Sequence, residues 1–140
     1  MPYDPELVSE TMAWFKKAAV DLRAAEHALL AQPPLLEDLL FHCQQVAEKA
    51  LKGFLVWHSR PFRKTHSLEE IGELCLAINP GLKSIIDPLV PLTQYAWEFR
   101  YPGEPEEPTA EEAQEALTLA RKAYETLLSC LPEQVRGPSA

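Results

Sequence analysis

The chain has 140 residues, of which 46% are hydrophobic and 24% are charged, and its formal net charge is -8. This length fits a single domain, and the hydrophobic content suffices for a buried core, which excludes an intrinsically disordered chain. The negative charge excludes a protein that binds nucleic acid with its whole surface. Any role in binding anions therefore requires a local patch.

Three cysteines, Cys43, Cys75 and Cys130, are far apart and form no CxxC motif. An odd number of cysteines without a signal peptide predicts free thiols in a reducing compartment. No apolar stretch approaches the roughly 20 residues that a membrane span needs. We expect a cytoplasmic protein that does not contact a membrane.

The first predicted helix begins at Pro5, because Asp4 is a typical N-cap residue and proline is favoured at the first helical position. Apolar residues then recur at steps of three and four, as in an amphipathic helix. The residues of this stripe are Leu7, Thr11, Trp14, Ala18, Leu22, Ala25 and Leu29. Pro33 and Pro34 end the helix.

The second predicted helix runs from about Leu36 to His58. Its wide apolar face consists of Leu39, Cys43, Val46, Ala47, Ala50, Leu51, Phe54 and Leu55. Phe41 and Val56 lie on the opposite side, which predicts that this helix is packed on more than one side. A partner chain is one source of that second surface.

The third predicted helix begins after Ser67, which forms a capping box with Glu70, and it ends at Asn79. A fourth helix is expected from Leu82 to about Arg100. Pro88 and Pro91 should break or kink this fourth helix into two pieces.

The fifth predicted helix follows an irregular acidic loop over residues 101–108 and is capped by Thr109. Its buried stripe consists of Ala113, Ala116, Leu117, Ala120, Tyr124, Leu127 and Leu128. We therefore predict an all-α, up-and-down bundle of about five helices over residues 1–131, followed by a frayed tail over residues 132–140.

Cations gather between Lys49 and Leu68, a stretch that contains no aspartate or glutamate. They are Lys49, Lys52, Arg60, Arg63 and Lys64, accompanied by His58 and His66. Such a cluster can hold the phosphate of a nucleotide or of RNA. Alternatively, it is a solvated basic edge that docks on an acidic surface of a partner or of a second copy.

The histidines lack the spacing of metal ligands, so we expect no metal site. His66 can fix the turn before the third helix by bonding a backbone carbonyl, and His42 is expected to be partly buried beside the apolar face of the second helix. Aromatic residues gather near Arg100 and favour packing in the core or at an interface, with stacking on a base as the alternative. They are Tyr95, Trp97, Phe99 and Tyr101.

Four stretches in chain order resemble one known family. They are WFKKAAVDLRAA over residues 14–25, FHCQQVAEKALK over 41–52, KTHSL over 64–68, and Tyr95 followed by Arg100-Tyr101-Pro102. Together they are similar to the HEPN domain, the higher eukaryotes and prokaryotes nucleotide-binding domain. The resemblance covers nearly the whole chain.

This resemblance implies a helical bundle that commonly forms a homodimer and is often encoded beside a minimal nucleotidyltransferase, as a toxin–antitoxin-like pair. Many HEPN proteins are metal-independent ribonucleases that carry an arginine, four to six residues and then a histidine. The histidine can act on the 2′-hydroxyl or the leaving oxygen, and the arginine can stabilise the charged phosphate.

The sequence departs from that motif, because the matching arginine is Arg100 and no histidine follows it. Arg60 and His66 have the motif's spacing, but they lie elsewhere in the chain. We therefore expect a dimeric binding and assembly module without a cofactor rather than an enzyme. The alternative is a ribonuclease with a rearranged site that uses Arg100, His66 or His42. Candidate phosphate-binding residues are Lys49, Lys52, Arg63, Lys64, His66, Arg100 and Tyr101.

Overall fold

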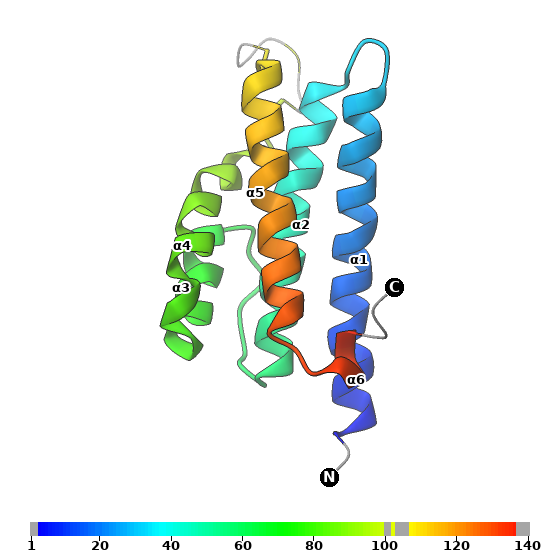
Figure 1. Cartoon of the computed structure of the whole chain (residues 1–140). Helices are drawn as coiled ribbons and strands as arrows, with labels where there is room; N and C mark the ends of the chain where they lie inside the picture. The colour runs from blue at the N-terminus through cyan, green and yellow to red at the C-terminus, as the bar shows by residue number, and fades with distance from the viewer. Residues whose placement is uncertain (1–2, 100–101, 103–106, 137–140) are drawn as a thin grey trace.

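The computed structural model describes residues 3–99, 102 and 107–136. Its longer helices are α1 (Pro5–Leu30), α2 (Leu36–Trp57), α3 (Leu68–Ile78) and α5 (Ala110–Ser129), with no strand in this part of the chain. Figure 1 shows α1 and α2 as an antiparallel hairpin with α5 beside it and the α3–α4 segment on the far side of α5 from α1. The predicted all-α fold is confirmed.

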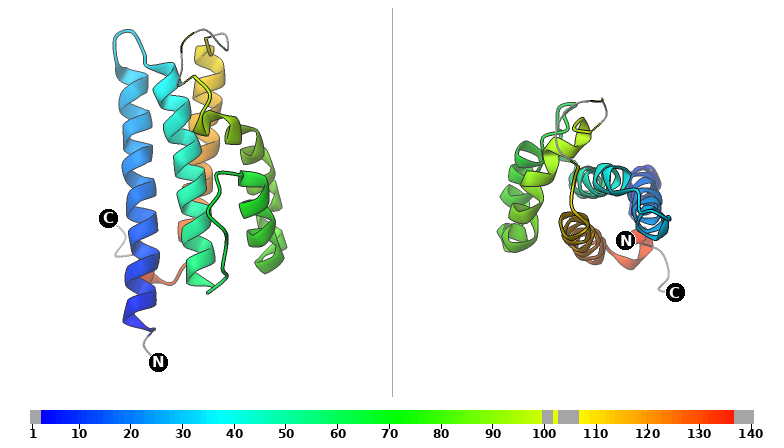
Figure 2. Two further views of the ribbon diagram at one scale, coloured as in Figure 1. Left: turned by 180° about the vertical axis from the view of Figure 1, so that it is seen from behind. Right: turned by 90° about the horizontal axis from the view of Figure 1, so that it is seen from above.

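Helix α2 is the centre of the bundle. It contacts α1, α5, α3 and the 3₁₀ segment η2 (Asp87–Ala96). Seen from above in Figure 2, α2 lies between α1 and the α3–α4 segment, with α5 alongside. Neighbours in the same chain therefore account for the two-sided packing predicted for α2, and this feature does not by itself require a partner chain.

Helices α1 and α2 approach each other closely at Gly53. A Cβ atom at this position would lie 2.6 Å from Cε2 of Phe15 and 3.1 Å from Cβ of Trp14. Phe15 is itself only 4% exposed, so its ring cannot easily move away. Glycine is the residue that lets the two backbones pack at this distance.

Side-chain caps fix the starts of three helices where the sequence predicts them. Oδ1 of Asp4 accepts from the backbone N–H of Glu6, and Oγ1 of Thr109 accepts from that of Glu112. Oγ of Ser67 accepts from the backbone N–H of Glu70 at 3.2 Å.

The predicted capping box at Ser67 forms only in part. The carboxylate of Glu70 binds Arg63 instead of the backbone N–H of Ser67. That N–H donates to Oγ1 of Thr65 at 3.1 Å. The turn before α3 is therefore held by hydrogen bonds within residues 63–70.

The region of the predicted fourth helix consists of short pieces: η1 (Pro80–Leu82), α4 (Lys83–Ile86) and η2 (Asp87–Ala96). The break expected from Pro88 and Pro91 is therefore present, because proline lacks the N–H that a continuous α-helix needs. The helical segment ends at Ala96 rather than near Arg100, and Phe99 has a positive φ of 68°.

The first residues of the expected frayed tail are helical in the structure. Residues Glu133–Arg136 form the short helix α6, and Val135 is only 2% exposed. Helix α6 contacts α1, so burial of Val135 and Leu131 against the bundle orders this part. Residues 137–140 lie outside the described part of the chain. None of the helices described is long and apolar enough to cross a bilayer.

Candidate functional site on helix α2

A buried carboxylate, Glu48, lies at the centre of a polar cluster on α2. Its Oε1 accepts from Nε2 of Gln44 at 3.0 Å and from Nδ1 of His66 at 2.7 Å, and its Oε2 accepts from Nζ of Lys52 at 3.0 Å. Gln44, Glu48 and Lys52 are four residues apart and therefore share one face of the helix. His66 reaches this face from the connection between α2 and α3.

Lys52 is enclosed by this cluster and by two aromatic rings. Its Nζ lies 5.8 Å from the ring centroid of Trp14 and 5.6 Å from that of Phe62. The residue is only 6% exposed, so its charge depends on Glu48 and the two ring faces. The ammonium of Lys52 is therefore part of the scaffold and is not presented to a ligand.

A second carboxylate, Asp21 of α1, binds two residues of α2. Its Oδ1 accepts from Nδ1 of His42 at 2.8 Å, and its Oδ2 accepts from Nζ of Lys49 at 2.5 Å. His42 and Lys49 are seven residues apart, so they lie on one side of α2 and face the same turn of α1. This pairing joins the two helices across their contact.

Both histidines are oriented in the same way. The carboxylate binds Nδ1, which directs the other ring nitrogen, Nε2, away from the carboxylate. The side chain of His66 is 60% exposed and that of His42 is 30% exposed. Of the two, His66 is better placed to exchange a proton with a bound molecule.

Glu48 is held in its charged form. Burial acts to raise its pKa, but the hydrogen bonds from Gln44, His66 and Lys52 outweigh this and place the pKa of Glu48 below its ordinary value of 4.5. The carboxylate is thus ionised at neutral pH and compensates the charge of Lys52.

The remaining predicted phosphate ligands differ in their surroundings. Arg63 is 74% exposed and pairs with Glu70, with 2.7 Å between Nη2 and Oε1. Lys64 is exposed and has no carboxylate partner among the described residues. Arg100 and Tyr101 lie outside the described residues. The structure therefore gives a carboxylate partner to Lys49, Lys52, Arg63 and His66.

Sequence reasoning did not assign a role to Asp21, Gln44 or Glu48. The four-residue spacing of Gln44, Glu48 and Lys52 was a detectable signal, because it places opposite charges and an amide on one helix face. Asp21 offered no such signal, since its partners come from another helix.

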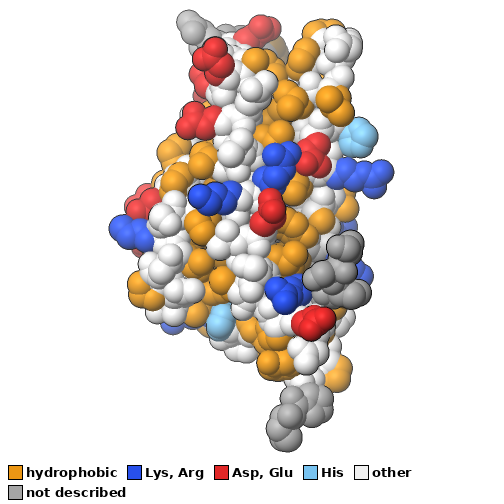
Figure 3. All heavy atoms as spheres, in the orientation of Figure 1, with side chains coloured by type: hydrophobic (Ala, Val, Ile, Leu, Met, Phe, Trp, Pro, Cys, Tyr) orange, Lys and Arg blue, Asp and Glu red, His pale blue; other side chains and the backbone are white. Residues whose placement is uncertain are grey.

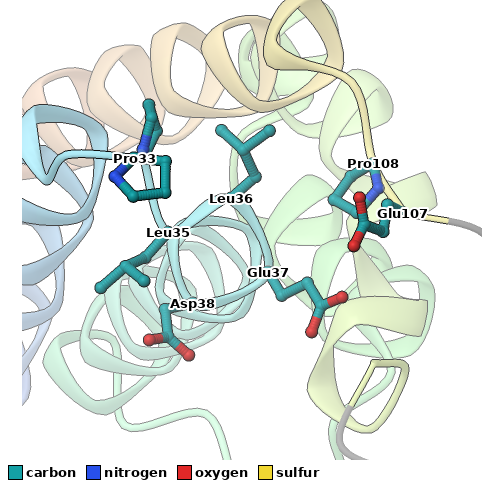
Figure 4. Close-up of a pocket in the computed structure, with 8 residues that line it drawn as sticks. Pro33, Leu35, Leu36, Glu37, Asp38, Glu107 and Pro108 are labelled. Carbon is teal, nitrogen blue, oxygen red and sulfur yellow. The ribbon is translucent and has the colours of Figure 1, made fainter. Parts of the chain in front are cut away.

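Two cavities lie at the end of the bundle where α5 begins. The first, of about 450 Å³, is lined by Pro33, Pro34, Leu35, Leu36, Glu37, Asp38, Glu107 and Pro108. Figure 4 shows the carboxylates of Glu37 and Glu107 on separate segments that border this space. The second, of about 380 Å³, adds Glu98 and Glu112 beside Tyr95 and Phe99. These carboxylates would repel a phosphate from both cavities.

The aromatic group near residue 100 is partly self-packed. The rings of Tyr95 and Phe99 stack with centroids 5.8 Å apart, while Trp97 is 55% exposed. Tyr101 lies outside the described residues. In the described part of the chain, no cluster of three histidine, cysteine or acidic side chains is arranged to hold a metal ion.

The comparisons with known proteins agree with the helical architecture. No curated protein and no solved structure matches the chain. The family model for the HEPN domain matches residues 11–131, a range that includes both carboxylate-centred clusters and all of α2 and α5. The chain therefore belongs to the HEPN domain family.

Proposed function

We propose that this chain is a binding and assembly module: the HEPN half, in homodimeric form, of a pair with a nucleotidyltransferase-like protein. Membership of the HEPN family supports a nucleotide- or RNA-related role in general. The observation that carries the choice of binding over catalysis is the internal compensation of the α2 clusters. Lys49 and Lys52 of α2 are already bound to the buried carboxylates of Asp21 and Glu48, as expected of a scaffold.

Phosphate contact in this proposal occurs at the connection after α2. Lys64 is exposed and unpaired within the described residues, and the imidazole of His66 projects outward from Glu48. Arg63 is largely exposed although it pairs with Glu70. Arg63 and Lys64 thus form a small cationic rim beside the imidazole of His66, and a nucleotide or RNA phosphate can approach this rim from solvent.

The assembly part is tested by co-expressing the chain with the product of the adjacent reading frame, which the proposal requires to be nucleotidyltransferase-like, and measuring the mass of the purified material by light scattering. We expect a HEPN homodimer that co-purifies with its partner at a fixed ratio. A strictly monomeric chain that elutes without a partner would reject this part of the proposal.

The phosphate part is tested by titrating the protein into fluorescein-labelled ATP and a labelled single-stranded RNA. The Lys64→Ala/His66→Ala double variant should bind more weakly than the wild type. Lys83→Ala is the control, because Lys83 is exposed on α4 and pairs with Asp87. Equal affinity of the double variant and the wild type would reject the rim as the contact.

A second candidate function is a metal-independent ribonuclease, and the orientation of His66 favours it. Glu48 fixes Nδ1, so Nε2 can accept the proton of a 2′-hydroxyl in RNA while its oxygen attacks the adjacent phosphorus. The bond from phosphorus to the 5′-oxygen then breaks, which leaves a 2′,3′-cyclic phosphate and a 5′-hydroxyl that takes its proton from water. The test is cleavage of RNA in the presence of a chelator. Cleavage that disappears in His66→Ala would support this function, and an inert wild type would eliminate it.

A further inference from the structure

The two cavities at the end of the bundle where α5 begins adjoin each other. Both the first, of about 450 Å³, and the second, of about 380 Å³, have Glu107 and Pro108 in their walls. The first continues from these two residues to the beginning of α2, as Figure 4 shows, and the second continues to the end of η2. We call the two cavities together the acidic groove, because five carboxylates line it: Glu37, Asp38, Glu98, Glu107 and Glu112.

The carboxylates of the acidic groove have no cationic partner in the described part of the chain. None of the ion pairs formed there includes any of the five. Glu37, Asp38 and Glu112 lie in the first turns of α2 and α5, where the helix dipole favours negative charge. Glu98 and Glu107 lie in no first turn of a helix, so the dipole does not account for them.

One oxygen of Glu98 lacks a hydrogen-bond donor. Its Oε2 is buried and accepts no hydrogen bond from the described residues. A buried carboxylate oxygen in this state costs free energy, because it has lost its contact with water and gained no donor in exchange. A cationic donor that enters the groove would remove this cost.

Two aromatic rings stand beside these carboxylates. The rings of Tyr95 and Phe99 line the second cavity and stack on each other with centroids 5.8 Å apart. Burial raises the pKa of Tyr95, and the charges of Glu112 and Glu98 raise it further, so both carboxylates act on this ring. A guanidinium suits such a wall, because it donates to carboxylates and stacks on aromatic faces.

The same end of the molecule exposes apolar side chains. Of the five large hydrophobic side chains that are exposed among the described residues, three belong to or adjoin the segments that line the groove: Leu30, Leu35 and Trp97. Figure 3 shows hydrophobic side chains over the tip of the α1–α2 hairpin, beside acidic side chains over the beginning of α5. An occupant of the groove must therefore supply apolar contacts as well as positive charge.

We propose that the acidic groove binds an extended segment of a partner protein in which arginines alternate with apolar residues. The arginines would donate to the exposed carboxylates at the rim and to Oε2 of Glu98, and the apolar residues would cover Leu35 and half-buried Leu36. The proposal goes beyond the proposed function, because it assigns a surface other than the cationic rim and a partner defined by its chemistry.

Other occupants fit the groove less well. A second copy of this chain that meets the groove with its own groove, as a two-fold interface requires, would bring carboxylates against carboxylates. A small organic cation would satisfy the charges but leave Leu35 and Trp97 uncovered. The phosphates of a nucleic acid would be repelled by all five carboxylates.

The test measures binding of a short fluorescein-labelled peptide of alternating arginine and leucine by fluorescence anisotropy at low salt. One matched peptide carries citrulline, which has the shape of arginine without its charge, in place of every arginine. The other carries glycine in place of every leucine. We expect the arginine–leucine peptide to bind at least about tenfold more tightly than either matched peptide, and its binding to weaken as salt is added.

Three variants locate the contact. The groove variant is Glu98→Gln/Glu107→Gln/Glu112→Gln, and its matched control is Glu10→Gln/Glu69→Gln/Glu73→Gln, which removes the same charge from exposed positions of α1 and α3. The groove variant should bind the arginine–leucine peptide at least about tenfold more weakly than the control, which should stay within about twofold of the wild type. Leu35→Ser should weaken binding of the arginine–leucine peptide and leave that of the arginine–glycine peptide unchanged.

Four outcomes would overturn the proposal. The first is a wild type that does not bind the arginine–leucine peptide, and the second is equal binding by the groove variant and its control, which would show attraction to the net charge alone. The third is displacement of the peptide by agmatine at equal concentration, which would assign the groove to a small cation. The fourth is a change in the mass of the protein in the groove variant, which would assign the groove to a second copy. None of these outcomes bears on the phosphate contact, which is tested with Lys64→Ala/His66→Ala.

Discussion

Nδ1 of His66 lies 2.7 Å from Oε1 of Glu48, which ties the connection between α2 and α3 to the middle of the central helix. The same carboxylate also compensates Lys52, which is almost fully buried between Trp14 and Phe62. Glu48 therefore performs two tasks at once: it holds the connection that carries Lys64 and His66, and it neutralises a buried charge in the scaffold beneath them.

Replacing Glu48 with glutamine should strongly destabilise the protein. The substitution leaves the ammonium of Lys52 buried without its counter-charge, and loss of one partner of a buried pair costs about 3 to 5 kcal/mol. Urea unfolding followed by circular dichroism measures this change as a lower midpoint. Glu70→Gln is the matched control, because its pair with Arg63 is exposed and is worth about 1 kcal/mol or less. Equal midpoints for the two variants would contradict the structural role of Glu48.

The stability of the wild type should depend on pH through Glu48. Burial acts to raise the pKa of Glu48, but its hydrogen bonds hold it below 4.5 in the folded protein. The ionised group therefore contributes stability that is fully present above the unfolded pKa of about 4.5 and is lost as the pH falls through the folded pKa. The difference in unfolding free energy between the wild type and Glu48→Gln should be constant near neutral pH and shrink below pH 4.5. A difference that does not change down to pH 3 would argue against this ionisation.

The helix limits were predictable because their signals are local. Asp4 and Ser67 cap helices that begin at the next residue, as expected, and α1 ends at Leu30, three residues before Pro33. The contacts of the site were not predictable in the same way. Asp21 meets His42, and Glu48 meets His66, across 21 and 18 residues, and such pairs depend on how α1, α2 and the connection pack.

The buried face of α1 also differs in part from the predicted stripe. The stripe named Trp14, Leu22 and Leu29, which are half-buried, while Phe15 and Asp21 are buried beside it. Periodicity gives the direction of a buried face but not its width, and α1 is covered by α2, by α5 and by α6. An aspartate becomes acceptable inside this face only because His42 and Lys49 pair with it.

The three cysteines should differ sharply in reactivity. Burial raises the pKa of the Cys43 and Cys75 thiols to about 12, whereas Cys130 is exposed at the end of α5. Because the thiolate is the reactive form, a disulfide reagent such as DTNB at pH 8 should label one thiol rapidly in the folded protein and three in guanidinium chloride. Loss of the rapid phase in Cys130→Ser would identify the labelled residue. Rapid labelling of all three thiols under native conditions would contradict the burial of Cys43 and Cys75.

Gly53→Ala should destabilise the protein although alanine is the better helix former. The substitution gains about 1 kcal/mol of helix propensity. Its Cβ would lie 2.6 and 2.8 Å from two ring carbons of Phe15, and overpacking in a filled core costs about 1 to 3 kcal/mol. We therefore expect a lower melting temperature for the single variant.

The control for Gly53→Ala is the same substitution in a Phe15→Ala background. Phe15→Ala alone should cost about 3 to 5 kcal/mol, because it opens a cavity in the core. In that background the new methyl group has no ring to meet, so Gly53→Ala should be neutral or stabilising by up to about 1 kcal/mol. The sign of its effect should thus reverse between the two backgrounds. A stabilising effect of Gly53→Ala in the wild type would show that α1 and α2 do not approach each other closely at Phe15 and Gly53.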